Sequence, residues 1–254
     1  MILSRGVLIH NTGLGRDVFR GRAAQHRAYS TTQQPRTGIA ASIAELPGVP
    51  KLAEHLNHVF APLQFPPELA ARILTHQSHK HSALTSNTRL SFIGRRVLQS
   101  YLLLFLDHSS GYTHDYEHVM ERALNTYVLG EHVGPQWQLG KVMKWAPATS
   151  NPSLANDPTS VVHLGKEATR SIGLYKVEGI AVEALVGGVF HQFGGQIAHK
   201  LFHTRLLPHL LLPGKSEGLP EALHADVLKI CKQMGGPQSD LSSPGWSSKD
   251  PGQS

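Results

Sequence analysis

The fold of this chain of 254 residues is decided by one stretch, Asn87-Thr88-Arg89-Leu90-Ser91-Phe92-Ile93-Gly94-Arg95. Apolar residues start inside this stretch and recur, mostly at intervals of three and four, as far as residue 105. These positions are Leu90, Ile93, Val97, Leu98, Tyr101, Leu102 and Phe105. Such intervals place side chains on one face of an α-helix. The spacing therefore predicts a long, largely buried helix over residues 88–106.

The same helical spacing recurs on both sides of this stretch. Before it, Leu52, Leu56 and Phe60 share a face, and Pro66-Pro67 is a common opening for the helix that follows. After it, further helices are predicted at residues 115–129, 135–145, 166–193, 195–207 and 219–233, with a loop at 146–160. No segment alternates apolar and polar residues convincingly, as a half-buried strand does. The sequence predicts an all-α fold.

Composition sets the limits of the folded part. Residues 30–50 are rich in Thr, Gln and Pro and end in Pro47-Gly48-Val49-Pro50, which is typical of a linker. The chain after Met234 is dominated by Ser, Gly and Pro, and we expect a disordered tail over 234–254. A single helical domain is thus predicted over residues 51–233.

The N-terminus has the composition of a mitochondrial transit peptide. Residues 1–29 contain five arginines and a single acid, Asp17. The run Arg27-Ala28-Tyr29-Ser30 resembles a presequence processing site, so we expect cleavage after Tyr29 and a location in the mitochondrial matrix. A basic tail without a targeting role is the alternative. The formal net charge of +6 includes +4 from this segment, which leaves about +2 on the mature chain. Charge alone therefore gives no case for nucleic-acid binding.

Bulk properties exclude several classes of protein. The longest apolar run, Tyr101–Leu106, is far shorter than the roughly 20 residues of a membrane span, so no membrane span is expected. Cys231 is the only cysteine, which excludes an internal disulfide and a cysteine-based zinc site. Among 17 histidines, His199 and His203 have helical spacing and His79-Lys80-His81 lies in a loop, yet zinc needs three or four converging ligands. We expect ordinary surface or core histidines and predict no metal or cofactor.

Seven basic side chains after residue 140 could contact phosphate groups as point charges or forked donors. They are Lys141, Lys144, Lys166, Arg170, Lys176, Lys200 and Arg205. We interpret them as an ordinary solvated surface rather than as a nucleic-acid interface.

Two segments of the chain resemble the ribonuclease III family. The first joins Leu74-Thr75-His76-Gln77-Ser78 to residues 87–95, and the second is Val182-Glu183-Ala184-Leu185-Val186-Gly187-Gly188-Val189-Phe190. The two segments occur in the family's order, and the resemblance extends over residues 50–212. It implies a ribonuclease III-like helical domain. The family cuts double-stranded RNA with divalent metal ions that four carboxylates hold.

The family's four acidic positions fall on Ser91, Arg95, Ile180 and Glu183, so one carboxylate of the four remains. Residues 85–100 contain no Asp or Glu that could replace the first two. Glu178 cannot replace Ile180, because two residues turn about 200° around a helix. Magnesium needs oxygen ligands, whereas the guanidinium of Arg95 is a fixed cation. With these departures, the resemblance predicts no catalytic residues, and hence a protein that is not an enzyme.

The resemblance also implies how the two signature helices pack. The family fold brings them together, so we expect Arg95 to form an ion pair with Glu183 in place of the metal. The alternative is that both side chains reach solvent. Glycine costs on the order of 1 kcal/mol per residue within a helix, so Gly187-Gly188 indicates close approach of another backbone. Either a dimer partner or the same subunit could supply that backbone.

A presequence, a lone domain and a degenerate site together are similar to ribosomal proteins of fungal mitochondria that consist of a lone ribonuclease III-like domain. This resemblance implies a structural role in the mitochondrial large ribosomal subunit. The implied partners are mitochondrial rRNA, other large-subunit proteins and a second ribonuclease III-like subunit in a heterodimer. The alternative is a free-standing mitochondrial RNA-processing or ribosome-assembly factor that pairs with an active ribonuclease III. A metal-dependent nuclease with rearranged ligands contradicts the count of acids.

Overall fold

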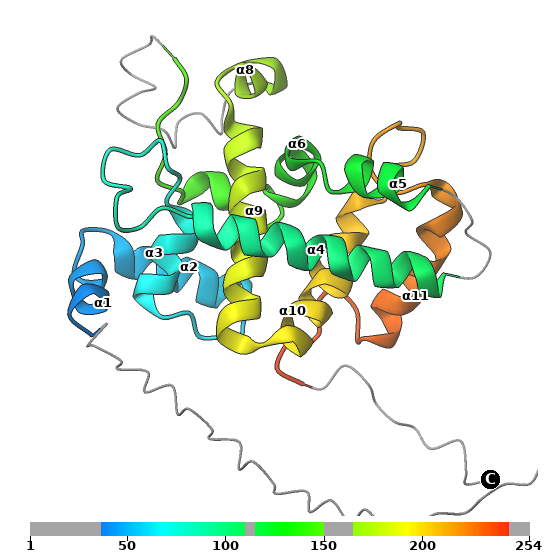
Figure 1. The fold of residues 1–254 in the computed structure, drawn as a ribbon, viewed down its shortest axis with the longest axis horizontal. Helices are drawn as coiled ribbons and strands as arrows, with labels where there is room; N and C mark the ends of the chain where they lie inside the picture. Colours follow the sequence, from blue (N-terminus) through cyan, green and yellow to red (C-terminus); the bar gives the residue numbers. More distant parts are fainter. Residues whose placement is uncertain (1–36, 110–114, 150–164, 244–254) are drawn as a thin grey trace, which may run out of the picture. The chain divides into compact units, whose positions relative to one another are not determined.

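The computed structural model describes residues 37–109, 115–149 and 165–243 (Figure 1). Over these ranges the regular structure is helical, and the only extended pairing is an isolated parallel bridge between Thr75 and Lys144. The all-α prediction is confirmed. None of the described helices is both long enough and apolar enough to span a membrane.

Two long helices cross at the centre of the fold, α4 (Thr88–His108) and α9 (Leu174–Phe193), as Figure 1 shows. The sequence predicted nearly the full length of α4, because its apolar spacing is regular. The middle of α9 is buried on every side from Ala181 to Val189. A helix that has no polar face belongs in the interior of a protein. The surviving acid, Glu183, is therefore carried on the most buried element of the fold.

Glycines let the two backbones touch where α4 and α9 cross. A Cβ atom on Gly94 would lie 1.7 Å from the carbonyl oxygen of Glu183, and one on Gly187 would lie 2.1 Å from that of Leu90. Any side chain at either position would collide with the other backbone. The backbone that approaches Gly187 thus belongs to the same chain, which decides between the two alternatives raised by the sequence. Gly188 faces the side chain of Ile73 instead.

Shorter helices surround this crossing. The N-terminal helices are α1 (Thr37–Ala44), α2 (Val49–Val59) and α3 (Pro67–Leu74). Between α4 and α9 lie α5 (Tyr116–Ala123), α6 (Thr126–Val128), a π-helical turn (Leu129–Val133), a 3-10 turn (Leu139–Lys141) and α8 (Lys166–Ser171). After α9 come α10 (Gly195–Leu201), a π-helical turn (Phe202–Leu206), 3-10 turns (Leu207–Leu210 and Glu221–Leu223) and α11 (His224–Gln233). Because α6 packs directly on α9, it brings Thr126 to the site described below.

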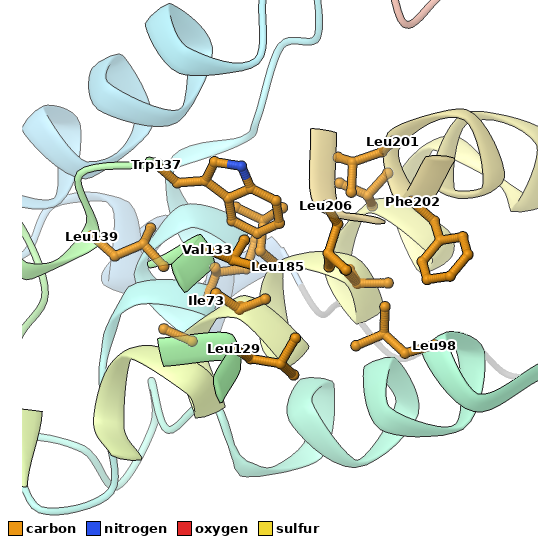
Figure 2. Close-up of a cluster of buried hydrophobic side chains, with 14 of the residues drawn as sticks. Ile73, Leu98, Leu129, Val133, Trp137, Leu139, Leu185, Leu201, Phe202 and Leu206 are labelled. Atoms are coloured by element: carbon orange, nitrogen blue, oxygen red, sulfur yellow. The ribbon is translucent and has the colours of Figure 1, made fainter. Parts of the chain in front are cut away.

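The hydrophobic core surrounds α9 (Figure 2). Ile73 of α3, Leu98 of α4 and Leu185 of α9 are all buried in it. Trp137 packs its ring edge-on against Phe60, with 5.1 Å between the ring centroids. Burying one such large apolar side chain contributes about 1.5–3 kcal/mol. This burial holds α9 in place and thereby fixes the position of Glu183.

Several predicted segments differ in the structure, and among them the helix predicted over 115–129 is divided into α5 and α6 at Leu124 and Asn125. Residues 135–145 form only the 3-10 turn Leu139–Lys141, because Gln138 has a φ of 52° and Lys144 pairs with Thr75. The helix predicted over 166–193 is divided into α8 and α9 at Gly173, whose φ of 87° is left-handed. The fold also starts before residue 51, since α1 and the buried Ile43 precede it.

The tail, predicted to be disordered from residue 234, is packed on the domain as far as Ser243. Leu241 is fully buried. The ammonium group of the buried Lys200 donates to the carbonyl oxygens of Asp240 (2.6 Å) and Ser243 (3.2 Å). Composition could not reveal this contact, because a lysine held by carbonyl groups leaves no periodic signal. The presequence with its site after Tyr29, the first part of the linker and residues 244–254 lie outside the described residues.

Candidate functional site

The four positions that the sequence assigns to a degenerate site lie on the two crossing helices. The structure brings Arg95 of α4 and Glu183 of α9 into contact. Ser91 is nearly buried, and its hydroxyl donates to the carbonyl oxygen of Thr88 at 3.0 Å rather than to Glu183. Ile180 is half-buried and offers no polar side-chain atom.

A forked ion pair joins Arg95 to Glu183. The Nε of Arg95 donates to Oε1 of Glu183 at 3.3 Å, and its Nη2 donates to Oε2 at 3.1 Å. The hydroxyl of Thr126 donates a further bond to Oε1 at 3.1 Å. Arg95 Nη2 also lies 3.4 Å from the Thr126 hydroxyl. The predicted ion pair is confirmed, and Thr126 completes it.

The two partners of the pair differ in exposure. The side chain of Glu183 is 1% exposed, whereas that of Arg95 is 52% exposed. Burial raises the pKa of the Glu183 carboxyl, and the hydrogen bonds and charge of Arg95 and the bond from Thr126 oppose that rise. Charge-assisted hydrogen bonds of this forked kind are among the strong ones in proteins. The arginine therefore supplies the compensation that a buried carboxylate requires.

These residues do not fit a pair of magnesium ions. Magnesium takes hard oxygen ligands in near-octahedral geometry, and two-metal hydrolysis needs several carboxylates around both ions. Both oxygens of Glu183 are occupied by Arg95 and Thr126, and the guanidinium stands where a further cation would have to approach. Within the three described ranges, no group of three or more His, Cys, Asp or Glu side chains could hold a metal ion.

A pocket of about 320 Å³ opens beside the ion pair. It is lined by Arg95, Gln99, Glu117, Met120, Glu121, Leu124, Asn125 and Thr126. Arg95 is the only basic residue of this lining and is already paired with Glu183, so Glu117 and Glu121 leave the pocket negatively charged. In the sequence, the spacing of four residues between Glu117 and Glu121 on a predicted helix was the signal that could have placed them on one face. Thr126 gave none, because nothing local marks its contact with α9.

Glu178 lies in a different part of the fold. A Cβ on Gly134 would lie 3.0 Å from Glu178 Oε2, so the side chain packs against the π-helical turn rather than α4. The helical spacing predicted this separation from Glu183. Glu178 is 3% exposed, and its Oε2 has no hydrogen-bond partner. Burial raises the pKa of its carboxyl to about 8, although a backbone hydrogen bond from Gly140 opposes this.

The histidine pair on α10 and the turn after it adds no site. His199 Nε2 and His203 Nε2 lie 3.1 Å apart. Aromatic rings cover the pair, since Tyr101 packs against His199 and Phe202 against His203. Burial, and after it the charge of His199, lowers the pKa of His203 to about 3. The imidazole of His203 lies in the core, and that of His199 lies at the edge of the core.

Six of the seven basic side chains considered above contact other parts of the chain. Lys141 donates to Gln138, Lys144 to Pro47, Lys200 to Asp240 and Ser243, and Arg205 to Ser239, while Lys166 and Arg170 pair with Glu131. Lys176 makes no hydrogen bond or ion pair within the described part of the chain. Most of this set therefore serves the fold itself.

The solved structures that are similar to this chain include two of the nuclease domain of ribonuclease III from Campylobacter jejuni. One, at 2.2 Å resolution, is 19% identical in sequence, with 58% of this chain and 88% of that chain covered and a TM-score of 0.44. The other concerns structural flexibility in a region involved in dimer formation, and is 19% identical over 58% of this chain and 91% of that one, with a TM-score of 0.43. No curated protein sequence gives a significant match. The sequence profile of the ribonuclease-III-like family matches residues 66–210, which is more than half of the chain. The chain therefore belongs to the ribonuclease-III-like family.

Proposed function

We propose that this chain is a non-catalytic ribonuclease III-like domain that binds RNA and a partner subunit and does not cut RNA. The observation that carries the proposal is the forked ion pair between Arg95 and Glu183. Metal-assisted hydrolysis of a phosphodiester requires ions that activate water and stabilise the leaving oxygen. A metal ion at Glu183 would have to displace a guanidinium that cannot lose its charge near neutral pH.

Two exposed apolar side chains on α4 support a partner subunit. Phe92 is 64% exposed and Leu103 is 41% exposed. They are 11 residues apart, which is about three turns, so they lie on the same side of the helix. Arg96 lies between them, with its guanidinium 5.5 Å from the centroid of the Phe92 ring, so the two are separate apolar side chains on one face rather than a continuous patch. Domains of this family bind RNA and form dimers, and we infer that a second ribonuclease III-like subunit covers this face.

We further propose that the protein belongs to the mitochondrial large ribosomal subunit, where it contacts mitochondrial rRNA and neighbouring large-subunit proteins. The support is the arginine-rich, acid-poor composition of residues 1–29, from which we propose import into the matrix and cleavage after Tyr29. The alternative is a free-standing mitochondrial RNA-processing or ribosome-assembly factor.

A nuclease assay tests the loss of catalysis. The purified chain is incubated with long double-stranded RNA and Mg²⁺ or Mn²⁺, beside the Glu183→Ala variant, and the RNA is resolved on a gel. We expect no cleavage by either protein. Cleavage that Glu183→Ala abolishes would show that the surviving carboxylate works in a nuclease. Cleavage that survives the substitution would place a nuclease site elsewhere, and either result overturns the proposal.

Sedimentation of mitochondrial lysate tests the location. We expect stable, near-stoichiometric migration with mature large ribosomal subunits. Migration with precursor particles only, or as a small complex with a second ribonuclease III-like protein, supports the processing or assembly factor. Absence of the chain from mitochondria contradicts both.

A further inference from the structure

A cluster of positive groups lies on the loop between α3 and α4 and on the elements beside it. It consists of His76, His79, Lys80, His81, Lys144 and Lys176, and we name it the histidine–lysine patch. The backbone of His76 donates to the carbonyl oxygen of Lys144 at 2.8 Å, and that of Lys144 donates to Leu74 at 2.8 Å. These bonds hold the loop to the segment that carries Lys144. Lys176, on the first turn of α9, completes the patch.

The positive groups of the patch repel one another, and among the described residues no negative group offsets this repulsion at His76 or His79. Burial lowers the pKa of His76 below 6.5, and the charge of Lys176 lowers it further. Burial lowers the pKa of His79, followed by the charges of His81, Lys144 and Lys80. Within the described residues, no carboxylate raises the pKa of either histidine. By contrast, burial and the charge of Lys215 lower the pKa of His132, and the charges of Glu131 and Glu217 oppose part of this shift.

The basic side chains of the patch are available to a ligand. Lys80 and Lys176 are exposed and make no hydrogen bond or ion pair within the described ranges. Lys144 donates one bond to the carbonyl oxygen of Pro47 at 2.9 Å, which leaves two N–H groups. The rings of His79 and His81 lie with their centroids 5.7 Å apart, and His81 is exposed. The patch therefore presents several separate N–H donors from three segments of the chain.

The pocket beside Arg95 has the opposite electrostatic character. Its one basic side chain is neutralised by Glu183, and Glu117 and Glu121 add negative charge. Phosphate groups are repelled there and attracted to the histidine–lysine patch. An RNA-binding surface on this domain is thus separate from the degenerate site.

We propose that the histidine–lysine patch binds the phosphodiester backbone of double-stranded RNA and that the bound phosphates draw protons onto His76 and His79. This inference rests on the proposed RNA-binding function and assigns a surface to it. Double-stranded RNA suits the patch because its phosphates repeat at regular intervals, so several cations can be neutralised at once. Lysine and histidine bind phosphate oxygens as point charges and single N–H donors.

The direction of the pH dependence follows from the environment of the histidines. In the free protein the pKa values of His76 and His79 are lowered, by burial and then by neighbouring cations. A phosphate nearby favours the charged imidazolium and raises both pKa values. The complex therefore holds more protons than the free protein, and affinity for RNA increases as the pH falls through the range where these groups titrate.

Fluorescence anisotropy with a short double-stranded RNA tests the proposal on the full chain. We expect several-fold tighter binding at about pH 6 than at about pH 7.5. The variant with Lys80→Ala and Lys176→Ala should bind more weakly and lower the slope of log affinity against log salt by about 2, one for each lost phosphate contact. The variant with His76→Gln, His79→Gln and His81→Gln should lose most of the pH dependence. Circular dichroism establishes that each variant is folded.

A matched control replaces two exposed lysines of α11, with Lys229→Ala and Lys232→Ala. This control removes the same charge from an element that lies away from the patch (Figure 1) and should bind RNA as the unaltered chain does. Equal RNA binding by the patch variants and the control would overturn the assignment of the histidine–lysine patch but would leave the RNA-binding function in place. Failure of the unaltered chain to bind overturns the RNA-binding function too. An affinity that does not change with pH removes the role of the histidines. Equally tight, patch-dependent binding of a polyglutamate peptide would show that the surface takes an acidic protein instead.

Discussion

Arg95 and Glu183 depend on each other unequally. Without Arg95, the carboxylate of Glu183 stays buried and loses its cation, whereas without Glu183 the half-exposed guanidinium can turn to solvent. Removing one partner of a buried pair costs more when the charge that stays behind is buried. We therefore expect substitution of Arg95 to lower the free energy of unfolding more than substitution of Glu183 does.

We expect Arg95→Met to lower the free energy of unfolding by roughly 1–3 kcal/mol, less than for a fully buried pair because Arg95 is half exposed. Glu183→Gln should cost less, because the amide keeps the bond from Thr126 and leaves no buried charge. Urea unfolding measures both, with Arg96→Met as a neighbouring exposed control. The loss in Arg95→Met should shrink as the pH falls, since a protonated Glu183 needs no cation. Equal losses in the two variants would contradict this account.

Glu178 gives a second prediction at the residue scale. Its folded pKa of about 8 lies above its ordinary 4.5, so the folded state takes up a proton that the unfolded state releases. Stability is then complete below pH 4.5 and falls as the pH rises toward 8. Glu178→Gln removes this loss, and we expect it to be more stable than the unaltered chain above pH 8 by up to about 5 kcal/mol, since each unit of pKa difference is worth about 1.4 kcal/mol. Thermal unfolding across pH measures the difference, which should vanish in acid.

The sequence located some of these residues and missed others for physical reasons. Arg95 and Glu183 could be paired because both lie at signature positions on helices that the family packs together. Thr126 could not be found, since its role depends on how a helix of three residues sits on α9. Helical spacing separated Glu178 from the site but could not reveal that the carboxyl is buried without a full set of partners.

At the scale of elements, the crossing of α4 and α9 leaves no room for a methyl group. We expect Gly94→Ala to cost more than about 3 kcal/mol or to prevent folding, despite a gain of about 1 kcal/mol in helix propensity. The added Cβ would meet the carbonyl oxygen of Glu183, and helix backbones cannot yield as side chains do.

Gly188→Ala is the matched control on α9. Its Cβ would meet the Cδ1 of Ile73 at 2.8 Å, which is the flexible end of a side chain. Thermal unfolding should show a far smaller loss than for Gly94→Ala. Similar losses would mean that the crossing does not depend on contact between backbones.

Regular elements were predicted better than irregular ones. α4 was found nearly whole because its apolar spacing runs without interruption. The helix predicted over 135–145 was wrong, because the pairing of Lys144 with Thr75 joins segments far apart in the sequence. The break between α8 and α9 had a local signal in Gly173, but a glycine inside a helical pattern does not by itself show a left-handed φ.

At the scale of the whole molecule, the C-terminal segment closes the domain. Deletion of residues 235–254 should lower the free energy of unfolding by roughly 2–4 kcal/mol, because it removes Leu241 from the core and takes away the acceptors of the Lys200 ammonium. Adding Lys200→Met to the shortened chain should recover part of the loss. Deletion of only 244–254 keeps these contacts and is the control. Differential scanning calorimetry measures the stability of these three shortened chains. Equal stability of the chains that lack 235–254 and 244–254 would show that the contacts of Leu241 and Lys200 do not stabilise the domain.

The fold class and the family of the domain could be predicted from the sequence, but the residues at which the domain begins and ends could not. Helical spacing gave an all-α fold, and two signatures gave the family. Composition placed the limits too far inward at both ends, since α1 is short, residues 235–243 are polar in composition, and both segments are held by single buried groups such as Ile43 and Leu241. Such anchors depend on the finished core, which no local pattern describes.

The ion pair between α4 and α9 also makes a metal site harder to reach by single substitutions. Replacing Arg95 alone by aspartate would set a second carboxylate against the buried Glu183, with no cation to separate them. Ions that could neutralise both would still lack ligands at Ser91 and Ile180. A substitution of Arg95 toward a metal site thus passes through a less stable protein, so selection for stability alone preserves the pair.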